Sequence, residues 1–313
     1  MRSARRELLA SRNLPTEGTR ASLGPPFYPD AVPVLHPQVD LVVLDEAVWR
    51  ARAAAHEARV DELIGEHLAR RGAGVKHPVH DFLFTYYSLR PAQLRRWSPG
   101  YGVRLVGGPT PVSDEEVHAR RDLVEGTHAL LAATAGRPAN FGCFGMHEWA
   151  MVYRLNDDET RHSAYPLRLG PLGTDEVVET HRIACSHFDA YRFFTAPARP
   201  LNILDPAAHD RPAFEQPACL HAGMDLYKHA FRLAPLVSSE LVADCFELAR
   251  DIRVLDMRAS PYDLADLGYD PVRIERPEGK QEYAAAQRGF AERGAPLRQR
   301  LIEECERLLA AVD

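Results

Sequence analysis

The sequence has only three lysines among its 38 basic residues, so arginine carries almost all of the positive charge. Acidic residues are in excess, and the formal net charge is −6. A protein that holds a nucleic-acid backbone needs clustered Lys and Arg side chains. This balance does not favour DNA as a partner, although a local basic face is still allowed.

Cysteine pairs and long apolar runs are also missing. The five cysteines are odd in number, are spread widely and include no CxxC spacing, which argues against a disulfide framework and a zinc knuckle. No apolar run approaches about 18 residues, so we expect no membrane span. The basic start, MRSARRELLASRN, lacks the apolar core and small-residue cleavage site of a secretory signal. These features predict a cytoplasmic protein with reduced thiols.

Helical patterns dominate what is present. Apolar residues recur at helical spacing over residues 44–71, and the sequence GAG ends the pattern. An aromatic-rich helix is expected next, and Pro91 should terminate or kink it. Ser113 and Glu116 form a capping box that begins another helix. The segments CLHAGMDLYKHAFRLAP and SSELVADCFELARDIRVLDMRA predict two more, and one or two helices close the chain.

Strand patterns are few. The segments YPLRLG and THRIACSH predict short strands, with a short helix, TDEVVE, between them. Residues 1–38 are rich in Arg, Ser, Pro and Gly and are expected to form a partly ordered arm. We therefore predict a mainly α protein of the α+β type, in which residues 39–313 form a single helical domain with a small strand insert.

Histidines that stand beside acids indicate where chemistry could occur. Three such pairs lie close to aromatic residues: His80 with Asp81, His147 with Glu148, and His187 with Asp189. An acid-paired histidine can serve in proton transfer, or it can cap a helix or fix a loop. Three pairs in interior elements favour a functional role for at least one of them.

The stretch FGCFGMHEWAMVYRL is the most specific of these sites. Its glycines free the backbone to turn sharply just before His147, and the apolar run that follows anchors the element in the core. We expect His147 to point into a polar pocket shared with His187 and with residues 251–263. Glu148 is expected to brace the glycine turn.

The segment CLHAGMDLYKHAF places His221, Asp225 and His229 along one face of a helix. Imidazole nitrogen and carboxylate oxygen are both ligands of first-row metals, so the pair His221 and Asp225 could hold a divalent ion. The aspartate could equally orient a histidine for proton transfer, or the face could be a solvated polar surface.

A second charged segment, RDIRVLDMRASPYDL, alternates acids and arginines and ends in a turn with a tyrosine. Such alternation predicts an ion-pair network or a cradle for a polar ligand. The segment EGKQEY adds a compact polar set at a helix start. Because GxxxxGK[ST] and GxGxxG are both missing, a nucleotide-phosphate loop is not supported.

Several blocks together resemble an actinobacterial family whose members are commonly labelled 3-methyladenine DNA glycosylase. They are HDFLFTYYSLRPAQLRRW, FGCFGMHEWAMVYR, CSHFDAYRFFT, CLHAGMDLYK and DCFELARDIRVLDMRASPYDL, and the resemblance spans residues 44–313. It implies a hydrolase that acts on a nucleobase-like N-glycosidic bond. The Gly-rich hairpin of helix-hairpin-helix glycosylases is missing, so no catalytic residue transfers by position.

Cleavage of an N-glycosidic bond needs a carboxylate and a pocket that stacks the base. We expect Asp251 or Asp256 to activate water or stabilise the cation, and His147 and His187 to assist proton transfer. The expected substrate-binding residues are His80, Asp81, Glu148, Asp189, Arg258, Tyr262, Asp263, Lys280, Glu282 and Tyr283. The alternatives are an enzyme on a small polar metabolite, assisted by a divalent metal on His221 and Asp225, and a non-catalytic ligand-binding protein.

Overall fold

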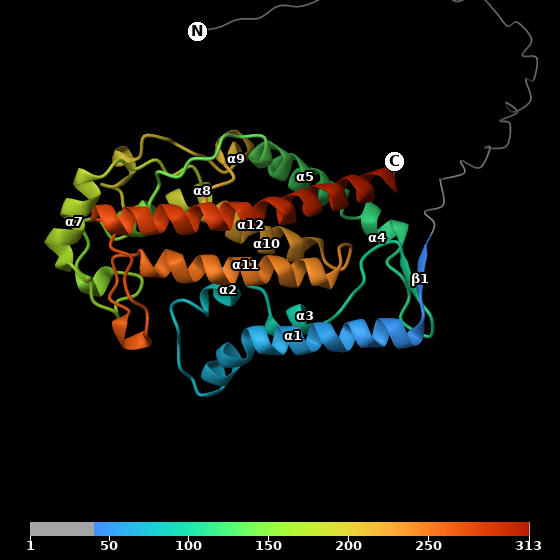
Figure 1. Cartoon of the computed structure of the whole chain (residues 1–313). Helices are drawn as coiled ribbons and strands as arrows, with labels where there is room; N and C mark the ends of the chain where they lie inside the picture. Colours follow the sequence, from blue (N-terminus) through green and yellow to red (C-terminus); the bar gives the residue numbers. More distant parts are fainter. Residues whose placement is uncertain (1–40, 313) are drawn as a thin grey trace, which may run out of the picture. The chain divides into compact units, whose positions relative to one another are not determined.

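Three long helices pack against one another along the centre of the computed structural model, which describes residues 41–312. They are α10 (Leu220–Leu233), α11 (Ser239–Arg258) and α12 (Pro277–Ala310). Figure 1 shows α11 and α12 side by side, with α10 close to both. These helices belong to one compact unit, Val39–Asp313, and the expected arm of residues 1–38 lies outside the described residues.

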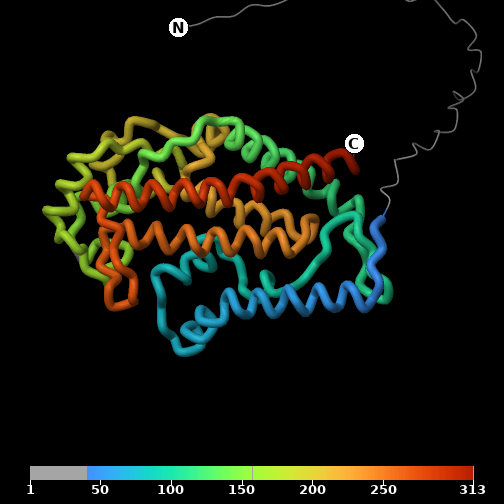
Figure 2. The backbone as a smooth tube through the Cα atoms, viewed as in Figure 1, coloured from blue at the N-terminus to red at the C-terminus, as the bar shows by residue number. Residues whose placement is uncertain are grey.

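Two further helices cover this centre. The long helix α1 (Glu46–Gly72) contacts α11, and α5 (Arg121–Ala135) packs along α12. The tube in Figure 2 follows the chain from α1 through a long irregular stretch before it reaches α5. Capping fixes several of the starts, because the side chains of Ser113 and Ser238 each accept a hydrogen bond from a backbone N–H of the turn that follows.

The remaining elements are short. They are the helices α2 (Phe82–Thr85), α3 (Pro91–Arg95), α4 (Asp114–His118), α6 (Met146–Ala150), α7 (Gly170–Thr180), α8 (Phe188–Tyr191) and α9 (Arg211–Phe214), and the 3-10 turns η1 (Asp157–Glu159), η2 (Arg199–Leu201) and η3 (Ala265–Leu267). Within the described residues, no helix is both long and apolar enough to cross a membrane.

The predicted mainly helical class with a small strand component is confirmed, but the strands lie elsewhere. The parallel strands β1 (Val42–Leu44) and β2 (Val103–Leu105) form the sheet, with Val42 opposite Val103. The segments YPLRLG and THRIACSH form only isolated bridges, Leu167 with Tyr262 and Ile183 with Asn202. The strand prediction was wrong there because a ladder needs a neighbour that stays alongside for several residues.

The expected aromatic-rich helix is broken into α2 and α3. Ser88, between them, has a φ of 55°, which is incompatible with a continuing right-handed helix. Pro91 begins α3 instead of ending a helix, because its missing N–H is unneeded at the first helical position.

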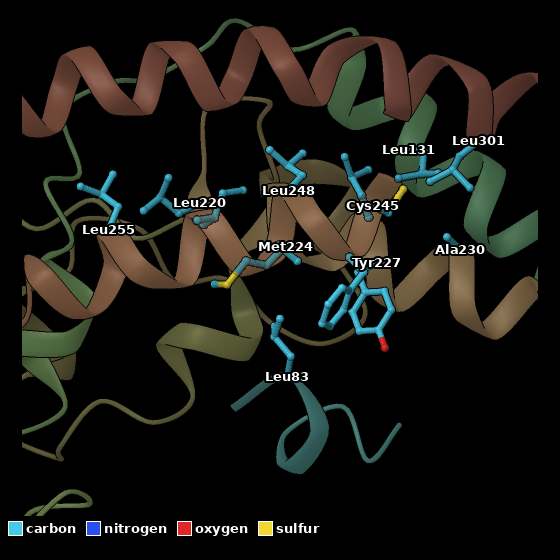
Figure 3. Close-up of a cluster of buried hydrophobic side chains, with 14 of the residues drawn as sticks. Leu83, Leu131, Leu220, Met224, Tyr227, Ala230, Cys245, Leu248, Leu255 and Leu301 are labelled. Atoms are coloured by element: carbon cyan, nitrogen blue, oxygen red, sulfur yellow. The ribbon is translucent and has the colours of Figure 1, made fainter. Parts of the chain in front are cut away.

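The core lies between the central helices. Figure 3 shows Leu220, Met224 and Tyr227 of α10 in one cluster with Leu248 of α11 and Leu301 of α12. Full burial of such side chains contributes about 1.5–3 kcal/mol each to folding. This core holds α10 and α11 rigidly, and the polar groups described next project from the same two helices.

Candidate active site

The short helix α6 places His147 and Glu148 in the interior. It begins after a turn in which Gly145 has a φ of 69°, a conformation that favours glycine. A Cβ at Gly145 would lie 3.3 Å from the ring of Tyr283, so the turn also packs closely on α12. The glycines therefore do direct the chain sharply inward before the histidine, as the sequence predicted.

His147 faces Asp256 of α11. Its Nε2 lies 2.8 Å from Oδ1 of that carboxylate, which confirms the expectation that His147 meets residues 251–263. Arg253, three residues before Asp256 on the same helical face, donates from Nη1 to Oδ2 of Asp256 at 2.5 Å and to Oε1 of Glu148 at 2.9 Å. Glu148 thus pairs with Arg253 and does not brace the glycine turn, so that part of the prediction was wrong.

Charges within this group control its protonation. Burial alone would raise the pKa of the Asp256 carboxyl, but His147 and Arg253 hold that pKa well below its ordinary value. Burial would lower the pKa of His147, and the attraction of Asp256 outweighs it and raises that pKa. Asp256 is therefore an anion at neutral pH.

His221 of α10 completes the group, which we call the Asp256 cluster: His147, Glu148, His221, Arg253 and Asp256. The ring of His221 lies edge-on to that of His147, with 4.4 Å between centroids. Burial, and then the nearby His147, hold the pKa of His221 well below its ordinary value, so the ring is neutral. Among the described residues, neither nitrogen of His221 has a hydrogen-bond partner.

Three members of the cluster could hold a metal ion. One ligand atom from each of His147, His221 and Asp256 lies within 4.8 Å of the others, and all three residues are buried. Two imidazoles and one carboxylate are a common ligand set for zinc and iron. Arg253 holds the second oxygen of Asp256 and so fixes its orientation, as outer partners of metal ligands do.

Two cavities with lining residues in common lie near this cluster, and members of the cluster line the inner one. The inner cavity, of about 20 Å³, is lined by Phe82, Tyr86, Glu148, Met151, Arg161, His162, Asp189, Phe193, His221 and Arg253. The outer cleft, of about 810 Å³, lies between α1, the α2–α3 segment and residues 161–165. Phe82, Arg161 and His162 line both, so the outer cleft and the inner cavity adjoin at these side chains.

A second, partly buried group of charges lies beside the first. We call it the Lys228 cluster: His187, Asp189, Arg211, Glu215, Asp225 and Lys228. Asp225 accepts from Arg211 at 2.8 Å, from Lys228 at 3.2 Å and from the hydroxyl of Tyr87 at 2.9 Å. The ring of His221 also lies 5.3 Å from that of His187, so this ring connects the two clusters.

The predicted proton-transfer residue His187 belongs to the Lys228 cluster. Its Nε2 lies 3.4 Å from Asp225 and 3.5 Å from Glu215. Asp225 was predicted as a metal ligand with His221, but it belongs to this cluster and is not part of the metal-capable group. The reason is that Arg211, from outside the predicted motif, and Lys228, within it, attract its carboxylate.

Other predicted residues lie outside both cavities. Asp251 lies on the opposite side of α11 and pairs with Arg293 at 2.7 Å. Asp263 is exposed and accepts from the backbone N–H of Ala265. The others in this group are Arg258 and Glu282, which pair with each other at 3.2 Å, and Lys280, near the ring of Phe144. The structure does not bring these five residues to the Asp256 cluster.

Of four further predicted binding residues, one lines the outer cleft and three do not. Asp81 lines the outer cleft, where it accepts from the ring of His67 and from a backbone N–H. His80 lies behind it, bonded to the guanidinium of Arg70 and the hydroxyl of Tyr269. The remaining two, Tyr262 and Tyr283, are buried in the core.

Three residues that matter here were not among the predicted site residues, although Arg253 belongs to the charged segment that was expected to form an ion-pair network. Arg253 was visible as the residue one helical turn before Asp256, which is the signal that would have found it. Phe82 and Arg161 carry no local signal, because they reach the cavities only through the packing of distant segments.

Comparison of the chain with protein-family models, with curated proteins and with solved structures finds no match. The resemblance to the glycosylase family therefore stays a prediction. The geometry of the Asp256 cluster and of the two cavities near it is what indicates a function.

Proposed function

We propose that this chain is a hydrolase of a small polar metabolite that uses a divalent first-row metal held by His147, His221 and Asp256. One observation carries the proposal: three ligand atoms from three helices converge within 4.8 Å in the interior. Neutral His221, without another hydrogen-bond partner among the described residues, is the form of histidine that binds metals.

The residues around this group suit the activation of water. A bound divalent metal would lower the pKa of a water molecule and supply a nucleophile at neutral pH. The inner cavity, of about 20 Å³, has the size needed for one water molecule. Glu148 lines that cavity and is placed to accept a proton from such a water, while Arg253 holds its carboxylate in position.

The position of Glu148 favours one of two reaction classes. Two histidines and a carboxylate occur in zinc hydrolases and in non-haem iron oxygenases. A carboxylate beside the ligand set provides the general base that hydrolysis requires. Among metal-assisted reactions, hydrolysis therefore fits the cluster best.

The test is metal-dependent stabilisation. We expect zinc or manganese to raise the Tm of the metal-stripped protein, because a ligand at 100 times its Kd adds about 2.7 kcal/mol to folding stability. The variant His221→Ala should lose this increase. His229→Ala is the matched control, since His229 is a buried histidine of the same helix outside the metal-capable group, and it should keep the increase.

Two results would contradict the metal proposal. One is a Tm of the intact protein that does not respond to zinc, manganese or ferrous iron. The other is a response that survives in His221→Ala, because the ion would then bind elsewhere. The affinity should also rise with pH, since the ion must displace the proton that the raised pKa keeps on His147.

N-glycosidic hydrolysis, which the family resemblance implies, is the second candidate. It is favoured by Glu148, a carboxylate on the inner cavity next to Phe82 and His162, whose rings could stack a base. An enzyme of this kind should release 3-methyladenine from methylated DNA or a free base from a nucleoside. No release from either substrate removes this candidate, and a ligand that raises Tm but is recovered unchanged indicates a binding protein.

A further inference from the structure

The outer cleft has a charge opposite to that of the whole protein. The chain carries a formal net charge of −6, yet the cleft is lined by four cationic side chains and one acid. The cations are Arg71, Lys76, Arg90 and Arg161, and the acid is Asp81.

These cations are available to a ligand. Among residues 41–312, none of the four has a carboxylate within ion-pair distance, whereas many arginines elsewhere are paired, such as Arg168 with Glu275 at 2.7 Å. Asp81 does not neutralise them, because its two oxygens already accept from His67 and from the backbone of His77. An excess of unpaired positive charge thus faces one concave surface.

Two histidines of the cleft, His77 and His162, supply rings and hydrogen bonds but little charge. Burial lowers the pKa of His162 to about 4 and also lowers that of His77. Both rings are therefore neutral at pH 7, and the positive potential comes from arginine and lysine. Binding of a carboxylate, which is fully ionised in this range, should then change little between about pH 6.5 and 8.

Planar surfaces complete the lining. Phe82 lies at the boundary of the cleft and the inner cavity, and the guanidinium of Arg253 packs on its ring at 4.0 Å. Arg161 is the cation that lines both spaces. A volume of about 810 Å³ is within the range of small-molecule sites.

We propose that the outer cleft binds the anionic group, a phosphate or a carboxylate, of a small metabolite with a planar ring. Arg161 and Arg90 hold the anion, and Phe82 and His162 flank the ring. The other end of the metabolite then points to Glu148 and His221 through the inner cavity. The placement of the reacting end of the metabolite rests on the proposed function. The anion site does not, because it is argued from the residues that line the cleft.

The probes are adenosine 5′-monophosphate, adenosine, inorganic phosphate and succinate, measured by calorimetry and by Tm. We expect adenosine 5′-monophosphate to bind at least about tenfold more tightly than adenosine, since charge-assisted bonds to arginine are the stronger kind. Phosphate and succinate distinguish the two anion chemistries. Added salt should weaken the binding of every charged probe.

The variants are Arg161→Gln with Arg90→Gln, and the control is Arg104→Gln. Arg104 is exposed on β2 and lies outside the cleft. We expect the double variant to lose at least about tenfold in affinity for adenosine 5′-monophosphate, and the control to match the unaltered protein. Metal-dependent stabilisation should persist in the double variant, so failure of the anion site and failure of the metal site are separate outcomes.

Three results would overturn the proposal. In the first, the folded protein binds none of the anionic probes. In the second, the double variant binds adenosine 5′-monophosphate as well as the control does. In the third, a single-stranded oligonucleotide binds far more tightly than the mononucleotide with a steep salt dependence, which would make the cleft a nucleic-acid surface.

Discussion

The Asp256 cluster is buried and the Lys228 cluster is partly buried, and both combine acids with histidine and arginine, yet they differ in how their central residues are paired. In the Lys228 cluster, Asp225 has bonds from Arg211, Lys228 and Tyr87. In the Asp256 cluster, His221 has free nitrogens and faces a cavity. A buried charge that only stabilises the fold needs partners for all of its hydrogen-bonding atoms. A neutral imidazole without such partners, beside a cavity, can instead bind a ligand or accept a proton. The ion pairs of Asp225 are therefore expected to stabilise the fold, and the unpaired ring of His221 is the basis of the proposed chemistry. His187, in the Lys228 cluster, also has both ring nitrogens without a hydrogen-bond partner among the described residues.

The largest expected effect comes from breaking the ion pairs of Asp225. Asp225→Asn removes the buried carboxylate that Arg211 and Lys228 share, while Glu215 and Asp189 still pair with these two cations. Removal of one partner from a fully buried ion pair costs about 3–5 kcal/mol, so we expect a loss somewhat below that range. Chemical denaturation should show this loss, while the metal response of the surviving folded protein is retained. A loss below about 1 kcal/mol, the range of exposed pairs, would mean that the cluster is not structural.

An intermediate effect should come from acid. Burial holds the pKa of His221 well below 6.5 and lowers that of His229 to about 4. The unfolded chain then binds more protons than the folded chain below about pH 6.5, so stability falls as pH drops from 6.5 towards 4. Tm measured across this window should decline, and His221→Ala should reduce the slope. An unchanged slope would mean that His221 is already protonated or exposed in the folded protein.

His147 contributes with the opposite sign. Its pKa is raised, so its contribution is present below about 6.5 and is lost as pH rises through the folded-state value. Within the Asp256 cluster, His221 therefore lowers stability as the pH falls below about 6.5, and His147 lowers it as the pH rises through its own folded-state pKa.

The smallest expected effect is at Asp251, which lies outside both clusters. Its side chain is one-third exposed and pairs with Arg293. Exposed ion pairs contribute about 0–1 kcal/mol, so Asp251→Asn should change neither stability nor metal binding by more than that. Loss of metal binding in this variant would favour Asp251 again as the water-activating carboxylate that the sequence predicted.

Helix periodicity explains why Asp256, and not Asp251, lies next to His147. Successive residues of an α-helix turn by about 100°. Asp256 and Arg253 are three apart and share a face, whereas Asp251 is five before Asp256 and lies roughly 140° away around the helix. The same arithmetic was available from the sequence and would have separated the two acids.

Other parts of the fold and site could not be read from local patterns. The capping box at Ser113 predicted a helix start correctly, because the signal is local. The parallel pair β1 and β2 joins segments far apart in sequence with three residues each, which gives no recognisable strand pattern. The convergence of α6, α10 and α11 was anticipated only in part, since it depends on how the core packs.

The volume of the inner cavity has a consequence for reaction order. The inner cavity beside Glu148 has space for about one water molecule, so only one water at a time could react there. A substrate group that entered first would fill the space and leave no nucleophile. In the proposed hydrolysis, water would therefore have to occupy the cavity before the substrate does, and a second water would enter after a product had departed. Each catalytic cycle would then use the single water molecule that entered when the previous product left.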